Sequence, residues 1–125
     1  MKRILFACFL LTATCAAPVI QTASAQTMAV TASAFTTQVN LMDTQLAAGD
    51  VTSATATWET INSMMKAELG ITKGQIASAT PDAATATAKY HNQVTMYKAI
   101  WALKSSLATN RTVLHTQLVA FGATI

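Results

Sequence analysis

Apolar residues recur along two adjacent stretches of the chain at steps that alternate between three and four, the spacing of one helical face. The first stretch predicts a helix over residues 27–48, and the second predicts a helix over residues 51–69. The two apolar stripes are Met28, Ala32, Phe35, Val39, Met42 and Leu46, and then Val51, Ala54, Trp58, Ile61 and Met65. Gly49 can close the first helix and Asp50 can cap the second. So short a link predicts an antiparallel hairpin, which should end near Gly70.

A longer helical segment follows a connector over residues 71–79 and extends over residues 80–121. It begins with Thr80 as a candidate cap, Pro81 in the first turn and Asp82 near the positive end of the helix dipole. No glycine or further proline interrupts it. At about 1.5 Å per residue, a continuous helix would be about 60 Å long, roughly twice the length of either preceding helix.

This segment carries two apolar stripes on different faces, because the stripes are about 120° apart around the helix. The stripe in the first half is Tyr90, Val94, Tyr97 and Trp101, and the stripe in the second half is Ile100, Leu103, Leu107, Leu114, Leu118 and Phe121. Asn110 interrupts the second stripe, where it either needs a buried partner or marks a bend or break. The stripe keeps its phase from Leu107 to Leu114, which favours a continuous helix.

These elements predict an all-α fold. We expect an antiparallel bundle of three to four helices, built from a short hairpin and one long C-terminal helix that is continuous or bent near Asn110. The hairpin can cover only half of a continuous helix, so a second copy of the chain would be the simplest cover for the other half. This predicts a homodimer through the C-terminal helix. If the chain breaks near Asn110, the tail can instead fold back as a fourth helix.

The N-terminal residues have the organisation of an export signal. The chain begins with a short basic segment, continues with an apolar run too short to span a membrane well, and then offers Ala23-Ser24-Ala25 to a signal peptidase. We therefore expect residues 1–25 to be removed. Residues 26–125 would remain as a single helical-bundle domain, periplasmic or secreted, with no stable membrane insertion after cleavage.

Removal of this segment changes what the composition implies. Both cysteines, Cys8 and Cys15, would leave with it, so the remaining domain could form no disulfide. The whole chain has a formal net charge of +3, but six basic and five acidic side chains remain beyond residue 25. So small a charge excess does not predict binding to nucleic acid or to an anionic membrane surface.

The two histidines cannot share a metal ion in the predicted fold. His91 and His115 would lie about 36 Å apart along a continuous helix. A di-iron site of the helical-bundle kind needs a glutamate three residues before each histidine, and Ala88 and Thr112 occupy those positions. Both histidines are therefore predicted to lie on the surface.

A small-ligand or metal carrier is one alternative function. Met28, Met64 and Met65 are expected near the level of His91, and thioethers with an imidazole suit Cu(I), although methionines equally suit core packing. For haem, no Cys-x-x-Cys-His motif is present for covalent attachment. Met28 and His115 resemble the ligands of b-type bundle cytochromes in chain order, but an up-down-up path would separate them.

A second alternative function comes from the connector. Ile71-Thr72-Lys73-Gly74-Gln75 resembles the Leu-Thr-x-x-Gln motif of periplasmic stress chaperones, with Ile71 in place of leucine. The resemblance covers these five residues once, and it implies a chaperone-like binder. Thr72 and Gln75 also have the spacing of a helix capping box, which is the alternative structural interpretation.

No enzymatic activity is expected, because the chain contains neither a Gly-x-Ser-x-Gly element nor an ordered Ser, His and Asp set. The leading hypothesis is a structural or protein-interaction module that acts by contact with an unidentified partner. The predicted contact residues are Tyr90, Tyr97 and Trp101 on one face and Leu114, Leu118 and Phe121 on the other. The alternative is that both sets form the core of the bundle.

Overall fold

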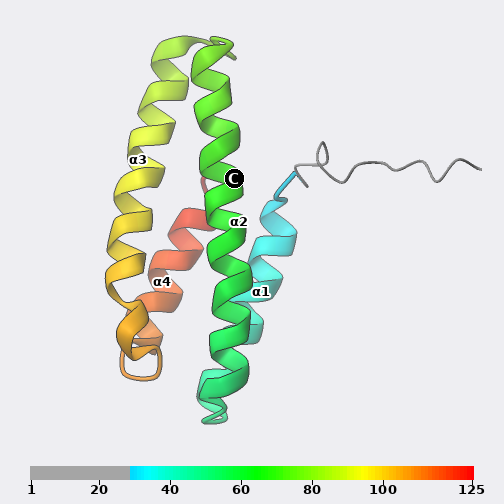
Figure 1. Ribbon diagram of the computed structural model, residues 1–125, viewed down its shortest axis with the longest axis vertical. Coiled ribbons are helices and arrows are strands. Elements are labelled where there is room, and N and C mark those ends of the chain that lie inside the picture. The colour runs from blue at the N-terminus through cyan, green and yellow to red at the C-terminus, as the bar shows by residue number, and fades with distance from the viewer. Residues whose placement is uncertain (1–28) are drawn as a thin grey trace, which may run out of the picture.

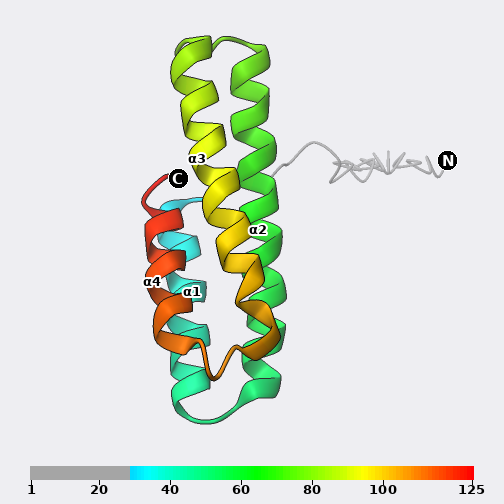
Figure 2. The ribbon, with the colours of Figure 1, turned by 90° about the vertical axis from the view of Figure 1, so that its left-hand side faces the viewer.

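The computed structural model describes residues 29–125, which form four α-helices and one short 3-10 helix. The elements are α1 (Ala32–Ala47), α2 (Val51–Ala77), α3 (Ala83–Ala102), η2 (Lys104–Ser106) and α4 (Arg111–Gly122). Each α-helix packs against the next along the chain, and α4 also packs against α1, so the four helices close into an antiparallel bundle (Figures 1 and 2). The predicted all-α bundle is confirmed. The predicted export signal and Met28 lie outside the described residues.

The α1–α2 hairpin forms where its turn residues predict it. The Asp50 carboxylate caps α2 by accepting a hydrogen bond from the Ser53 amide at 3.0 Å. Gly49 has a φ of +77°, a backbone conformation that residues with a Cβ rarely adopt. The Thr31 hydroxyl caps α1 through the Ala34 amide at 3.1 Å. Local chemistry therefore sets the ends of both helices.

One cluster of buried apolar side chains forms the core of the bundle. It contains Phe35, Val39, Met42, Leu46, Ala54, Trp58, Ile61, Met65, Ile100, Leu107, Leu114, Leu118 and Phe121. The Phe35 and Phe121 rings have centroids 5.6 Å apart and join α1 to α4. Within the described residues, both hairpin stripes are buried except at the helix starts, where Ala32 and Val51 are exposed. Burial of this apolar surface is the main force that holds the helices together.

α2 is longer than the sequence pattern predicts, because it continues past Gly70 to Ala77. Gly70 and Gly74 both lie inside the helix, and a Cβ added to either would meet no atom within 4 Å. The predicted connector over residues 71–79 is therefore mostly helical. Contact with α3 explains this, since packing can outweigh the weak helix propensity of glycine.

α3 begins two residues later than predicted, and Asp82 rather than Thr80 is its cap. The Asp82 carboxylate accepts hydrogen bonds from the Thr85 amide at 2.8 Å and from the Thr85 hydroxyl at 2.7 Å. Because α3 starts at Ala83, Pro81 belongs to the turn before the helix and not to its first turn; the peptide bond between Thr80 and Pro81 is cis. Aspartate is a strong N-cap because its oxygens pair with the free amides of the first turn.

The predicted continuous helix over residues 80–121 is wrong. α3 ends at Ala102, the chain turns through η2, and α4 folds back against α1. The Asn110 side chain stabilises the turn by donating a hydrogen bond to the Leu103 carbonyl at 3.1 Å. Folding back buries the second apolar stripe within one chain, whereas a continuous helix would leave much of it in water. The alternative of a fourth helix after a break near Asn110 is confirmed.

The helices differ in length, so the bundle has four helices at one end and two at the other. α2 and α3 extend beyond α1 and α4 in both views (Figures 1 and 2). None of the helices within residues 29–125 is both long and apolar enough to cross a membrane.

A buried polar network lies where the apolar core ends. The Glu68 carboxylate, only 3% exposed, forms an ion pair with Lys89 at 3.0 Å and accepts a hydrogen bond from the side-chain amide of Gln93 at 3.2 Å. The Thr72 hydroxyl donates a hydrogen bond to the side-chain oxygen of Gln93 at 2.8 Å. The side-chain NH2 group of Gln93 also donates to the Thr124 hydroxyl at 3.0 Å. The network therefore joins α2, α3 and the C-terminal residues, and it satisfies the polar groups that the packing buries.

Candidate functional site

The three predicted contact residues on α4 lie in the core. Leu114, Leu118 and Phe121 are fully buried, so they offer no surface to a partner. The structure supports the alternative interpretation, in which these three residues belong to the core of the bundle. The predicted homodimer required a continuous helix with an uncovered stripe, and α4 instead packs this stripe inside the bundle. The stripe gives no reason for dimerisation, which stays an untested prediction.

The other predicted contact residues form a partly exposed stripe between α2 and α3. We call Tyr90, Val94, Tyr97 and Trp101 the aromatic seam; the first three are half-buried and Trp101 is 38% exposed. The Tyr97 hydroxyl donates a hydrogen bond to Asn62 of α2 at 3.1 Å. Because these residues are three or four positions apart, they share the side of α3 that faces α2.

Trp101 is the most exposed member of the aromatic seam, and several side chains hold its ring. The Tyr97 ring stacks at a centroid distance of 6.0 Å, and the buried Trp58 ring lies 6.4 Å away. The Lys104 ammonium lies 3.8 Å from the centre of the ring, within cation–π distance, and the Lys66 ammonium lies 5.9 Å away. These contacts restrict the motion of an exposed aromatic side chain.

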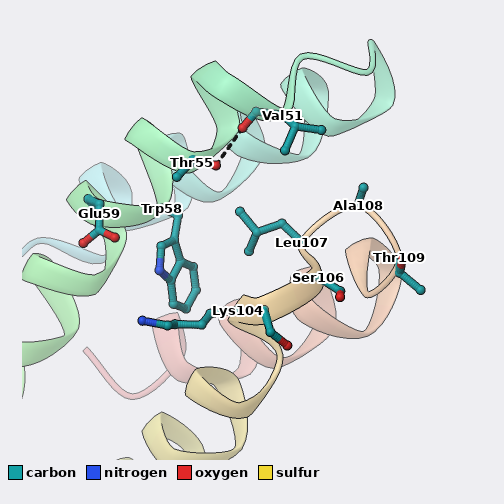
Figure 3. A pocket seen from close by; sticks show the side chains of 10 residues that line it. Val51, Thr55, Trp58, Glu59, Lys104, Ser106, Leu107, Ala108 and Thr109 are labelled. Carbon is teal, nitrogen blue, oxygen red and sulfur yellow. Dashed lines mark hydrogen bonds between the residues drawn. The ribbon is translucent and has the colours of Figure 1, made fainter.

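A groove of about 420 Å³ lies beside this cluster, at the base of the bundle (Figure 3). α3 ends at Ala102, and the groove lies between the first turns of α2 and the α3–α4 connection. Its lining residues are Val51, Thr55, Trp58, Glu59, Lys104, Ser105, Ser106, Leu107, Ala108 and Thr109. Trp58 and Leu107 extend toward each other across it, and Lys104 passes beneath Trp58 (Figure 3). We call this the basal groove.

Charged side chains are distributed unequally over the described residues. Two ion pairs are present there: Lys89 with Glu68, and Arg111 with Asp43 at 2.7 Å. The remaining lysines, Lys66, Lys73, Lys98 and Lys104, are exposed on α2, α3 and η2. Of the other acidic residues, Asp50 and Asp82 cap helices, and Glu59 lines the basal groove. The described lysines outside the two ion pairs therefore all lie on the α2–α3 side of the molecule.

Hydrogen bonds shift the pKa of three aspartates. The Arg111 guanidinium donates two hydrogen bonds to Asp43, at 2.7 and 2.9 Å, and these are the main cause of a lowered pKa for that carboxyl. Hydrogen bonds from Ser53 lower the pKa of Asp50, and hydrogen bonds from Thr85 lower the pKa of Asp82. All three favour the ionised form, because the donors stabilise the negative charge. None of the three lines the basal groove.

Of the residues considered for metal or haem binding, Met28 lies outside the described residues, and the other four lie within them. His91 is exposed on α3, and His115 is half-buried on α4. Met65 is buried in the core, and Met64 packs against it. Within residues 29–125, no group of three histidine, cysteine or carboxylate side chains is placed to hold a metal ion.

The segment that resembles the chaperone motif lies inside α2. Thr72 is fully buried, and its hydroxyl also lies 3.1 Å from the Glu68 carbonyl of the preceding turn. Thr72 is therefore not the start of a helix, so the capping-box interpretation is wrong. Ile71 and Gln75 are half-buried on the same helix.

The sequence pattern predicts neither the basal groove nor the lysines around Trp101. The groove is lined by residues 104–109, which follow the end of α3. A continuous helix over residues 80–121 contains no such connection, so that interpretation does not predict a groove. One signal was available: Lys98 lies three residues before Trp101 and Lys104 three residues after it, a spacing that places all three close together on a helical surface.

Comparisons with known proteins leave these surface features as the basis for a functional argument. No protein-family model, curated protein or solved structure matches the chain.

Proposed function

We propose that this chain is an exported protein-binding module, and that it binds its partner through the aromatic seam and the basal groove. The observation that carries the proposal is the exposed Trp101 ring, held by Tyr97, Trp58 and Lys104 next to an open groove. Tryptophan and tyrosine are enriched among the residues that dominate binding energy at protein interfaces. Holding the ring in place lowers the entropy that a partner must overcome on binding.

The opposite side of the bundle offers a weaker case. Its large exposed apolar side chains are Leu41 on α1, and Val113 and Val119 on α4. Single exposed aliphatic residues are normal on soluble proteins and need no partner. Aromatic rings are absent from this group, and none of the three residues lines the basal groove. They therefore serve as controls for the test of the proposal.

Site-specific photo-crosslinking in the organism that makes the protein tests the proposal. A photoreactive phenylalanine analogue is placed at Tyr90, in the seam, and at Thr55, on the edge of the basal groove. Matched variants carry it at Val113 and at Val119, which are at least as exposed as Trp101. We expect discrete protein adducts from Tyr90 and Thr55 and none from the α4 positions. Trp101→Ala should reduce the adduct yield.

Two results would contradict the proposal. One is equal adduct formation from both sides of the bundle, which would indicate unspecific contact. The other is an absence of protein adducts from Tyr90 and Thr55. If native mass spectrometry of that material also showed a retained small molecule, the basal groove would be assigned to a small-ligand carrier instead.

A further inference from the structure

We infer that the bound partner segment is acidic and inserts a large apolar side chain into the basal groove. This inference rests on the proposed function and specifies the chemistry of the partner. It depends on two observations, the distribution of charge on the α2–α3 side and the lining of the groove.

Four lysines of the described residues, Lys66, Lys73, Lys98 and Lys104, take part in neither ion pair. Lys66 and Lys104 lie close to the Trp101 ring, and Lys98 is one helical turn before Trp101 on α3. Lys73 is seven residues after Lys66, so it occupies the same face of α2 two turns further along. Among the acidic side chains of α2 and α3, Glu68 pairs with Lys89, and Asp50 and Asp82 cap the helix starts. This leaves Glu59, which lines the groove together with Lys104, as the acidic side chain beside these lysines. Complementary charge therefore favours a segment rich in aspartate or glutamate.

The basal groove is lined by both apolar and charged side chains. Trp58 and Leu107 are buried, Val51 is 46% exposed, and these three are the large apolar side chains of the groove lining. Lys104 both lines the groove and contacts Trp101, so it lies between the apolar surface and the aromatic seam. A partner with an apolar side chain beside a carboxylate can use both features at once. A bulky side chain in the groove would also desolvate the ion pair that its neighbouring carboxylate forms with Lys104.

The first experiment selects ligands without assuming their sequence. A random dodecapeptide display library is selected on the immobilised domain, and in parallel on a Trp101→Ala variant. We expect peptides enriched in aspartate or glutamate next to leucine, phenylalanine or tryptophan, and loss of this enrichment on the variant. Selected peptides that are neutral or basic would overturn the inference.

The second experiment measures the affinity of the best selected peptide for charge variants. Lys98→Glu and Lys104→Glu should each weaken binding by about threefold to tenfold, whereas Glu59→Gln should tighten it by about twofold. The matched control is the double variant Thr36→Glu with Thr116→Glu, which makes the same change in net charge on exposed positions of α1 and α4. It should change the affinity by less than about twofold, because those charges are distant and screened.

Further measurements distinguish an acidic peptide from an anionic membrane surface and from unspecific charge effects. Raising the salt concentration from about 50 mM to about 500 mM should weaken the peptide complex, because exposed ion pairs are screened. Vesicles containing anionic phospholipid should not compete with the peptide; competition would assign the lysines to a membrane surface and overturn the inference. Equal weakening by the control variant would overturn it too. Site-specific adducts from Tyr90 that are insensitive to Lys98→Glu and Lys104→Glu would leave the proposed function intact while removing the acidic partner.

Discussion

The Arg111–Asp43 pair shows how one residue pair supports the fold-back of α4. Arg111 is the first residue of α4, and its two hydrogen bonds to Asp43 join that helix to α1. The geometry is bidentate, which is the strong arrangement for a guanidinium and a carboxylate. Both side chains are partly exposed, so solvent screens the interaction.

We expect the contribution of Asp43 to stability to depend on pH. Its pKa is lowered in the folded protein, so its stabilising effect is present above the unfolded-state pKa of about 4 and is lost as pH falls through the lower folded-state pKa. The free energy of unfolding should therefore differ between wild type and Asp43→Asn near pH 7, and the difference should shrink by about pH 2.5. Urea unfolding of both proteins at the two pH values measures this.

Wild type must be compared with Asp43→Asn because Asp50 and Asp82 also have lowered pKa values. The stabilising contributions of these two carboxylates are also lost in acid. Their contribution is common to wild type and Asp43→Asn, so it cancels in the difference. A difference that is the same at both pH values would show that Arg111 does not stabilise the ionised carboxyl of Asp43.

At the scale of the helices, α2 illustrates how packing overrides local preference. Two glycines lie in its C-terminal half, where each costs conformational entropy in a helix. The helix nevertheless continues for two turns beyond Gly70, because contacts with α3 and the polar network around Thr72 hold it. The absence of neighbours around both glycines leaves room for a side chain.

Gly70→Ala and Gly74→Ala should each therefore stabilise the protein by about 0.5–1 kcal/mol, measured by chemical or thermal unfolding. Gly122→Ala is the matched control within α4, since its Cβ would lie 3.0 Å from the Phe35 ring. The control should be neutral or destabilising, because the core must shift to admit the methyl group. Destabilisation by Gly70→Ala would mean that α2 ends earlier than Ala77.

At the scale of the whole molecule, the buried polar network links the end of the core to the chain terminus. Gln93 is fully buried, and its amide group bonds to residues of α2 and to Thr124. Removing one member of such a network leaves buried groups without partners, which costs more than the bond alone contributes.

Gln93→Ala should lower the free energy of unfolding by about 1–3 kcal/mol and speed amide hydrogen exchange in residues 119–125. Gln117→Ala removes a half-buried glutamine of α4 whose side chain makes no hydrogen bond in the described structure, so it is the control. The control should have little effect on either measurement. If both variants lose the same stability, the network does not tie the C-terminal residues to α3.

Much of the fold follows from the sequence because its determinants are local. The three-and-four spacing around Phe35 and Trp58 establishes the helical faces of the hairpin, and Gly49 with Asp50 establishes its turn. The aromatic seam was found in the same way, since Tyr90, Tyr97 and Trp101 share one face of a helix whatever it packs against. These features depend on periodicity and capping, which act over a few residues.

What the sequence left open was decided by long-range packing. The phase of the apolar stripe is compatible with a continuous helix or with a turn at residues 103–110, and only the burial of Leu114, Leu118 and Phe121 against α1 favours the turn. Because α4 folds back, these three residues become part of the core and are not the predicted contact surface. The turn that follows α3 also lines the basal groove. Local periodicity cannot distinguish these outcomes, because the apolar area gained on folding back depends on residues far away in the chain.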